Sequence, residues 1–340
     1  MSGGELVSGW KLAGDPTLPK DVYSAPAPKN VTLARHLFVD GVRAARTRRN
    51  ASRALTLDTH PACVACSYSV NSTSALSWSN PSDVEFVYSG VAASWAEERC
   101  SVESVAAVSA AGEAGTNITM KQPCFWNLVK GHPVAMGSII PAYVENVREH
   151  LSSPGQWYFD KAKQLVLYYP LPGQDMSKVE AMLAVEETLV KIDGAKNHYW
   201  ADVTFEYGTW LRPMQGAGYV EEQTGACDIC PYGVELQDGC GLHDSMEVTP
   251  GNVAVSAGKN IAFANCTFQH LGAYATSALN GSQNVSWRGC SFRDVSAGAV
   301  ALGDVNLKAL GAAATQWDKD FTVEDCEIEN LPVEYSGPST

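Results

Sequence analysis

The chain of 340 residues has too little positive charge for a protein that binds nucleic acid or an anionic membrane surface. Lys and Arg number 24 against 37 Asp and Glu, so the formal net charge is −13. An acidic surface repels phosphate backbones and anionic lipids, so we expect no nucleic acid among its partners. The same charge argues mildly against a polyanionic substrate, although the net charge does not exclude a local basic groove.

Several recognisable segments are also missing. No uncharged apolar run approaches the length of a membrane span, so we expect no membrane insertion. The first five residues have neither the basic start nor the apolar core of a secretory signal. The sequence has no Gly-rich phosphate cradle followed by Lys-Ser/Thr, and no Gly-x-Ser-x-Gly elbow. It therefore gives no support to nucleotide-driven or elbow-type hydrolase chemistry.

Cysteines and glycosylation sequons, by contrast, are plentiful. The chain has ten Cys, and Asn-x-Ser/Thr occurs at Asn30, Asn50, Asn71, Asn117, Asn265, Asn280 and Asn284. Disulfides and N-glycans are features of extracellular proteins, so we predict a secreted protein. Asn in stacked turns creates sequons by chance, and this explains several of them. We expect glycans at Asn71 and Asn117, although chance explains these two sequons equally well.

The strongest order is an internal repeat near the C-terminus. Residues 260–268, 284–292 and 320–328 align position by position. Each block alternates apolar and polar residues, bends, and then places a Cys two residues before a large apolar side chain. Alternation with a period of two indicates strands with one buried face, and matching positions indicate strands stacked in register. The sequence therefore predicts a solenoid whose coils bury their faces against one another.

Further strands complete this picture. A second strand of each coil is predicted at residues 253–256, 274–277 and 299–302, and an earlier coil at 189–192 and 203–205. Residues 67–120 have short alternating runs that predict an antiparallel insert. Residues 156–160 and 164–169 read as a hairpin. Helix should be scarce, with residues 175–187 as the best short candidate.

Several strings then suggest a family. They are Gly3-Gly4 with Gly9-Trp10, His36-Leu-Phe-Val-Asp-Gly-Val-Arg43, Pro154-Gly-Gln-Trp-Tyr-Phe-Asp160, and Leu331-Pro-Val-Glu-Tyr-Ser-Gly337. The chain resembles secreted, pectin-lyase-like β-helix proteins, and among them the glycoside hydrolases that carry an inserted β-sandwich and include α-L-fucosidase and xylanase activities. The resemblance implies an all-β, right-handed parallel β-helix. It also implies first β-helix strands at 1–52, a sandwich-like insert at 53–150, coils at 151–340, and truncation at both ends.

Glycoside cleavage requires a carboxylic acid and a carboxylate facing one groove. Asp304 ends a predicted strand, Asp294 lies at a corner, and Glu334 lies in the following coil. We name these three as catalytic candidates. The alternative for Asp294 and Asp304 is that they form turns by bonding local backbone.

Substrate-binding candidates are one histidine and three aromatic residues. His270 has the place in its coil that Asp294 has in the next, so the two are candidates to line one groove. A solvated turn histidine is the alternative. Trp210, Tyr219 and Tyr274 fall near strand ends and are candidate sugar platforms. Ordinary core packing is the alternative for each.

Two groups of cysteines have different expected roles. Cys266, Cys290 and Cys326 recur at one repeat position, which predicts a small apolar ladder inside the coils. Cys227, Cys230, Cys240 and His243 have a spacing that suits zinc, but disulfides explain these cysteines better in a secreted protein. Cys63, Cys66, Cys100 and Cys124 are expected to pair in or beside the insert.

Three functional hypotheses follow. The first is a secreted glycoside hydrolase that acts on an oligo- or polysaccharide with an Asp/Glu pair. The second is a non-catalytic extracellular β-helix that binds glycan or serves a structural role. The third and weakest is a polysaccharide lyase. We expect a monomer without a cofactor, with calcium and zinc left open.

Overall fold

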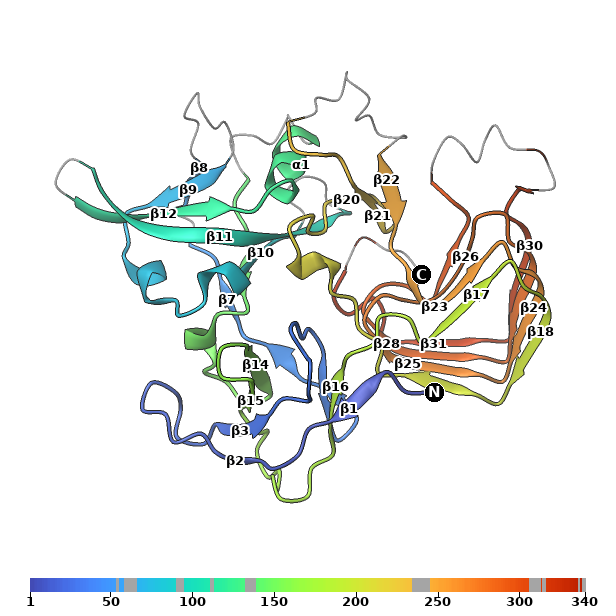
Figure 1. Ribbon diagram of the computed structural model, residues 1–340, viewed down its shortest axis with the longest axis horizontal. Coiled ribbons are helices and arrows are strands. Elements are labelled where there is room, and N and C mark those ends of the chain that lie inside the picture. The colour runs from blue at the N-terminus through green and yellow to red at the C-terminus, as the bar shows by residue number, and fades with distance from the viewer. Residues whose placement is uncertain are drawn as a thin grey trace.

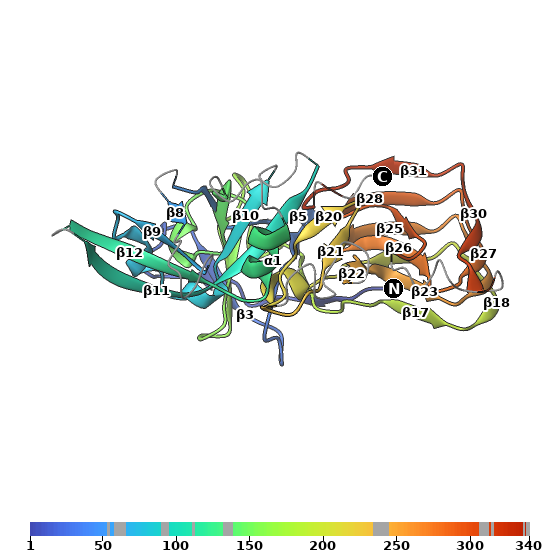
Figure 2. The same ribbon diagram turned by 90° about the horizontal axis from the view of Figure 1, so that it is seen from above.

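The computed structural model describes residues 1–52, 55–57, 66–89, 95–110, 113–131, 139–233, 245–305, 313, 316–335 and 337. Strands dominate these residues, as predicted for an all-β protein. The helices of this part are α1 (Cys124–Gly131) and the short 3-10 helices η1 (Ser74–Ser77), η2 (Pro81–Asp83), η4 (Arg148–His150) and η5 (Arg212–Met214). Within it, no helix has the length and apolar character that crossing a membrane requires. Figures 1 and 2 show antiparallel sheets and a stack of parallel strands side by side along the long axis.

The stack consists of three four-stranded parallel sheets. The first contains β17 (Val190–Asp193), β23 (Gly251–Ser256), β26 (Tyr274–Leu279) and β29 (Val300–Leu302). The second contains β18 (Lys196–Ala201), β24 (Lys259–Ala264), β27 (Gln283–Arg288) and β30 (Lys319–Glu324). The third contains β19 (Thr204–Glu206), β25 (Thr267–Leu271), β28 (Ser291–Val295) and β31 (Glu327–Glu329). The chain visits the three sheets in turn, so each coil gives one strand to each sheet.

Strand register confirms the predicted repeat. Equivalent residues of successive coils pair as Ile261–Val285–Phe321, Phe263–Trp287–Val323 and Phe268–Phe292–Ile328. The rings of Phe268 and Phe292 are nearly parallel, with centroids 4.9 Å apart. The predicted cysteine ladder is also present: Cys266, Cys290 and Cys326 are free thiols packed in this core. Stacking therefore buries the apolar face that one coil cannot bury alone.

The turns between sheets stack as well. The Nδ2 of Asn260 donates to the Oδ1 of Asn197 at 2.8 Å, and the Nδ2 of Asn284 donates to the Oδ1 of Asn260 at 2.9 Å. These three residues have φ of 60°, 58° and 54°. Asn tolerates this left-handed conformation better than most residues, which explains its recurrence at this place in the coils.

The N-terminal segment and residues 156–184 form two antiparallel sheets next to the stack. One has the order β1 (Gly4–Leu6), β16 (Ala181–Ala184), β4 (Leu37–Val39), β5 (Val42–Arg43). The other has the order β2 (Lys11–Leu12), β3 (Tyr23–Pro26), β15 (Leu165–Tyr168), β14 (Gln156–Asp160), β6 (Ala45–Arg46), in which β14 and β6 are parallel.

These sheets confirm one expectation and overturn another. β14 and β15 form the predicted hairpin. The helix expected within residues 175–187 is wrong, because β16 occupies part of that segment and pairs with both β1 and β4. Pairing partners far away in sequence therefore override the local helical preference. The parallel stack begins at β17, beyond residue 151.

The inserted region forms a seven-stranded antiparallel sheet. Its order is β7 (Arg48–Asn50), β13 (Tyr143–Glu145), β10 (Glu85–Ser89), β11 (Glu97–Ala110), β12 (Glu113–Met120), β9 (Ser67–Val70), β8 (Thr56–Leu57). Buried side chains such as Tyr68, Phe86 and Phe125 form its core. A disulfide joins Cys100 to Cys124, two of the four cysteines that were expected to pair in or beside this region. A small antiparallel sheet of β20 (Glu221–Gln223), β21 (Ala226–Asp228) and β22 (Met246–Val248) leads back to the coils.

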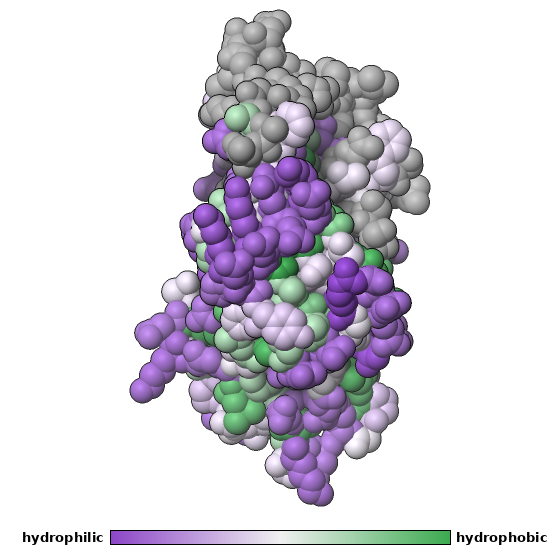
Figure 3. Space-filling model, turned by 90° about the vertical axis from the view of Figure 1, so that its right-hand side faces the viewer, coloured by the Kyte–Doolittle hydropathy of each residue, from purple (hydrophilic) through white to green (hydrophobic). Residues whose placement is uncertain are grey.

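The second sheet of the stack forms one end of the molecule. Figure 3 faces this end and shows hydrophilic side chains over much of it. Exposed residues on these strands include Lys196, Asn260, Asn284, Arg288 and Glu324. On the two middle strands Ile261, Phe263, Val285 and Trp287 are buried, so the alternation seen in the sequence separates a solvated face from the core there.

Candidate functional site

A cavity of about 420 Å³ lies where the coils, the N-terminal strands and the inserted sheet meet. We call it the junction cavity. Arg43 lines it from β5, Glu145 from β13, and Glu334 from the segment after β31. The other lining residues are Arg35, His36, Ala44, Ala45, Arg46, Arg48, Gln156 and Val333. The cavity thus combines two carboxylates with several cationic side chains.

Arg43 ties the N-terminal strands to the coils. Its Nε donates to the Oδ1 of Asp294 at 2.9 Å, and its Nη1 donates to the Oγ of Ser296 at 3.0 Å. Its Nη2 donates to the carbonyl oxygens of Asp294 and Leu271, at 2.9 Å and 3.1 Å. The side chains of Arg43 and Asp294 are only 15% and 13% exposed. Limited exposure makes this multiple, charge-assisted contact stronger than a surface ion pair.

Asp294 also contacts His270, the residue at the matching place in the preceding coil. The pairing of β25 with β28 brings these two positions side by side. The Nδ1 of His270 lies 2.8 Å from the Oδ2 of Asp294. The imidazole also stacks on the ring of Tyr207 in the coil before, at 5.3 Å between centroids. The structure therefore brings together the two candidates that the repeat placed at equivalent corners.

Glu334 is held by His36. The Nε2 of His36 lies 2.7 Å from the Oε2 of Glu334, and its Nδ1 lies 2.9 Å from the Oγ1 of Thr209. Burial lowers the pKa of His36 to about 4, so the ring is neutral at pH 7. A neutral ring beside an ionised carboxylate carries its hydrogen on Nε2, and Nδ1 then accepts from the Thr209 hydroxyl.

The charge state of Glu334 follows from its neighbours. Burial by itself acts to raise the pKa of Glu334, but His36 and Arg35 outweigh it and hold that pKa well below its usual range. Asp294 behaves in the same way: burial raises its pKa, and His270 and Arg43 lower it by more. Both carboxylates are therefore ionised at neutral pH.

A buried network of arginines and glutamates forms the wall behind the cavity. The Nη1 of Arg35 lies 2.8 Å and 3.0 Å from the two carboxylate oxygens of Glu85. The Nη1 of Arg99 donates to Glu145 at 2.7 Å, and the Nε of Arg48 donates to it at 2.5 Å. Burial acts to raise the pKa of Glu145, but Arg99 and Arg48 lower it below its usual range. Both carboxylates that line the cavity are therefore ionised, so each suits the role of base or nucleophile better than that of acid.

Asp304, the third catalytic candidate, lies elsewhere. It follows β29, and its Oδ1 accepts from the N–H of Val305 at 2.8 Å. Burial, with a smaller contribution from the charge of Asp304, raises the pKa of Asp318. Asp318 accepts from the N–H groups of Gly281 and Ser282, where the first sheet passes to the second. Asp304 therefore belongs to that corner, whereas Asp294 lies at the end of the third sheet.

The three candidate sugar platforms are core residues. Trp210, Tyr219 and Tyr274 are 4%, 0% and 4% exposed, and they share a buried cluster with Tyr335. Ring centroids of Trp210 and Tyr219 are 5.4 Å apart. A sugar platform needs an open ring face, so the structure replaces the substrate-binding expectation for these three rings with core packing.

The cysteine and histidine set considered for zinc is only partly described. Cys240 and His243 lie outside the described residues. Cys230 is disulfide-bonded, so it offers no thiolate to a metal. Cys227 is a buried free thiol, and burial raises its pKa to about 12. In the described part, no group of three or more His, Cys, Asp or Glu side chains is arranged to hold a metal ion.

The two glycosylation candidates differ in exposure. Asn71 is exposed just after β9. Asn117 is half-buried in β12, and its Nδ2 donates to the Oγ of Ser67 at 3.1 Å. A glycan attaches to this same nitrogen, so Asn71 is the better acceptor of the two.

Sequence reasoning missed most of the junction cavity. His36 and Arg43 belong to a string that was noted only for family resemblance, and Glu145 belongs to no repeat. The roles of His36 and Arg43 arise from contacts across more than two hundred positions, in the pairs Arg43–Asp294 and His36–Glu334. Periodicity in one segment carries no signal for such contacts.

Comparisons with known proteins give one structural result. No family model matches the sequence. No curated protein matches it either. A solved structure named glycoside hydrolase superposes with a TM-score of 0.77 at 22% identity, over 99% of this chain and 60% of that chain. The present chain thus spans about 60% of the length of that neighbour. At this identity the likeness concerns the fold, and the chain has a glycoside-hydrolase-like fold.

Proposed function

We propose that this chain is a secreted carbohydrate-active protein that binds an oligo- or polysaccharide in the junction cavity and hydrolyses a glycosidic bond. In this proposal its coils form a right-handed parallel β-helix. The observation that carries the proposal is the ionised Glu334 carboxylate, which lines the cavity and is held by His36. The glycoside-hydrolase-like fold supports the same substrate class.

Glu334 takes the role of general base or nucleophile, because its carboxylate is ionised and 13% exposed. His36 is a positioning residue: its hydrogen bond orients the carboxylate and leaves the other oxygen for substrate or water. Asp294 acts through Arg43, which lines the cavity and, after its four hydrogen bonds to the coils, keeps one Nη1 hydrogen for a sugar oxygen. We place Asp294 in a supporting role and assign no step to Asp304.

A second candidate is glycan binding without cleavage. Hydrolysis needs a protonated acid, and Glu145 and Glu334, the carboxylates that line the junction cavity, both have lowered pKa values. A cavity with ionised carboxylates and arginines still binds sugar hydroxyls well. This observation favours binding as the alternative to hydrolysis.

A glycan-release assay tests the proposal. The chain and its Glu334→Gln, Glu145→Gln and Glu329→Gln variants are incubated with plant and algal polysaccharides and aryl glycosides. Glu329 is 66% exposed on β31 and serves as the matched control. We expect release by the wild type and by Glu329→Gln, and a loss of at least 100-fold in Glu334→Gln, as expected for a group acting on the reacting atoms.

The other outcomes discriminate among the hypotheses. Binding without release, measured by calorimetry on the same glycans, would favour the non-catalytic candidate. An unsaturated product that depends on calcium would favour the lyase. Undiminished release by Glu334→Gln would remove Glu334 from the mechanism, and neither binding nor release on any glycan would overturn the proposal.

A further inference from the structure

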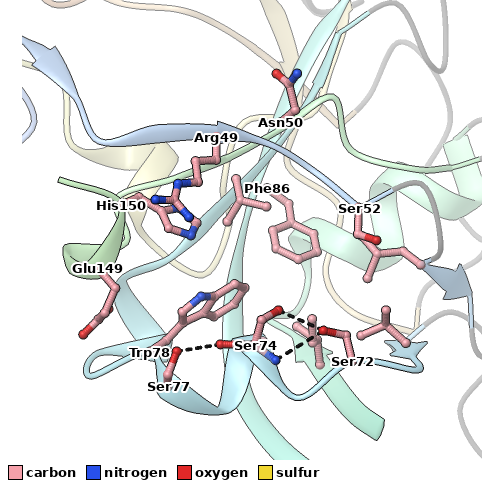
Figure 4. Close-up of a pocket in the computed structure, with 15 residues that line it drawn as sticks. Arg49, Asn50, Ser52, Ser72, Ser74, Ser77, Trp78, Phe86, Glu149 and His150 are labelled. Atoms are coloured by element: carbon pink, nitrogen blue, oxygen red, sulfur yellow. Dashed lines mark hydrogen bonds between the residues drawn. The ribbon is translucent and has the colours of Figure 1, made fainter. Parts of the chain in front are cut away.

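A second cavity, of about 350 Å³, opens on the inserted sheet. We call it the sheet cavity (Figure 4). Its lining comes from β7 at one edge of the sheet and from the end of β9 near the other edge, so the sheet curls around it. Its floor is apolar and consists of the buried residues Leu55, Val70, Phe86, Ile118 and Val144. Clefts of this size at the mouth of a curled sheet are common places for small ligands.

The rim of the sheet cavity differs from its floor. Trp78, at the end of η1, and His150, at the end of η4, meet edge to face with ring centroids 6.4 Å apart. Arg49 lies beside His150 in Figure 4, and Ser74 and Ser77 lie on the side of Trp78. An aromatic face next to hydroxyl, guanidinium and imidazole groups suits a ligand with one apolar face and many hydroxyls.

Two polar atoms on this rim need a partner. The Nδ1 of His150 and the Oε2 of Glu149 are buried, and neither has a hydrogen-bond partner within the described part of the chain. The other oxygen of Glu149 accepts from the N–H of Ser79 at 3.2 Å. Buried polar atoms without partners are costly, and a small shift of the rim side chains that lets a ligand hydroxyl reach them removes that cost.

We propose that the sheet cavity binds a sugar ring, with Trp78 against its apolar face and Glu149 and His150 bonded to its hydroxyls. The inserted sheet then serves as a glycan-binding module separate from the junction cavity. The inference does not depend on the hydrolase proposal, because none of these residues lines the junction cavity.

The sugar has two candidate sources with the same chemistry. One is a residue of an external glycan. The other is an N-glycan of the chain itself, because Asn50 lines the sheet cavity, is exposed and begins an Asn-x-Ser sequon. The test therefore needs protein with and without N-glycans.

The main experiment uses protein made without N-glycans, titrated with a panel of monosaccharides and oligosaccharides by calorimetry and saturation-transfer NMR. We expect binding by the wild type and at least a tenfold weaker affinity in Trp78→Ala. Trp95→Ala is the matched control, since Trp95 is 58% exposed on the inserted region and does not line the cavity. Glu329→Gln changes an exposed residue outside both cavities and should bind as well as the wild type.

A second variant protects the test against misfolding of Trp78→Ala. Ser77 is exposed at the mouth, so Ser77→Tyr should obstruct the sheet cavity without removing core atoms, and it should abolish the same binding step that Trp78→Ala weakens. If the Asn50 glycan occupies the cavity, the glycosylated wild type should not bind added sugar, and glycosylated Asn50→Gln should regain that binding. Equal binding by glycosylated wild type and glycosylated Asn50→Gln supports an external glycan. No binding by unglycosylated protein, or equal binding by wild type, Trp78→Ala and Ser77→Tyr, would overturn the proposal.

Discussion

His36 and Glu334 are 298 positions apart, yet the Nε2 of the first lies 2.7 Å from the Oε2 of the second. His36 precedes β4 and Glu334 follows β31, so one hydrogen bond joins the N-terminal strands to the last described coil. The carboxylate that we propose as catalytic is thus oriented by a residue outside the coils. Stability and activity should therefore both depend on this bond.

Stability should fall as the pH is lowered because of His36. Its pKa is about 4 when folded and 6.5 for an ordinary histidine. Between these values the unfolded chain binds a proton that the folded chain does not, so the free energy of unfolding falls with falling pH, by up to about 1.4 kcal/mol per unit. When the free energy of unfolding is measured in urea between about pH 7 and about pH 5, it should fall less steeply with falling pH in His36→Gln than in the wild type. The exposed His198→Gln is the control, and equal slopes in wild type and His36→Gln would contradict the prediction.

Arg43 should stabilise the junction between the N-terminal strands and the coils. Arg43→Ala leaves the Asp294 carboxylate, 13% exposed, without its cation, and we expect a loss of about 2–4 kcal/mol in the free energy of unfolding. Arg43→Lys should recover only part of it, because Lys lacks the forked donors. The control is Lys191→Ala. Lys191 is 67% exposed and pairs with Asp193 on the surface, so this variant should change the free energy of unfolding by less than about 0.5 kcal/mol. Chemical denaturation measures all three.

Equivalent positions in different coils should differ in their contribution to stability. Phe292 is fully buried between Phe268 and the next coil, whereas Ile328 in the same column is 46% exposed. Phe292→Ala should cost about 3–5 kcal/mol through lost burial and a cavity. Ile328→Ala should cost about 1 kcal/mol or less, because much of its side chain already contacts water. Similar losses in the two variants, measured by urea unfolding, would argue against the stacked register.

The Cys100–Cys124 disulfide should stabilise the inserted sheet. It closes a loop with a sequence separation of 24, and its removal in the double variant Cys100→Ser, Cys124→Ser should cost about 2–4 kcal/mol. The melting temperature, followed by far-UV circular dichroism, measures the effect. Cys266→Ser serves as a control for replacing a buried sulfur without breaking a disulfide. A double variant as stable as the wild type would show that the bond contributes little.

The coils were predictable because their evidence is local and repeated. Residues such as Phe268, Phe292 and Ile328 recur at equal places, and the stacked register follows from that recurrence. The helix expected within residues 175–187 was wrong because β16 is stabilised by pairing with distant β1 and β4, which no local window contains. For Trp210, Tyr219 and Tyr274 the sequence left core packing and sugar binding open, and the buried cluster that they form with Tyr335 decides for core packing.

The sequence by itself determined the all-β class, the stacked coils, the cysteine ladder and the neighbouring places of His270 and Asp294. All of these depend on periods of two residues along a strand and on repeats between coils, which the order of residues contains directly. Only the tertiary structure decided that Arg43 meets Asp294, that His36 meets Glu334, and that Glu145 faces the same cavity. Those contacts join strands of three different regions, and their charge states follow from mutual burial that no single segment encodes.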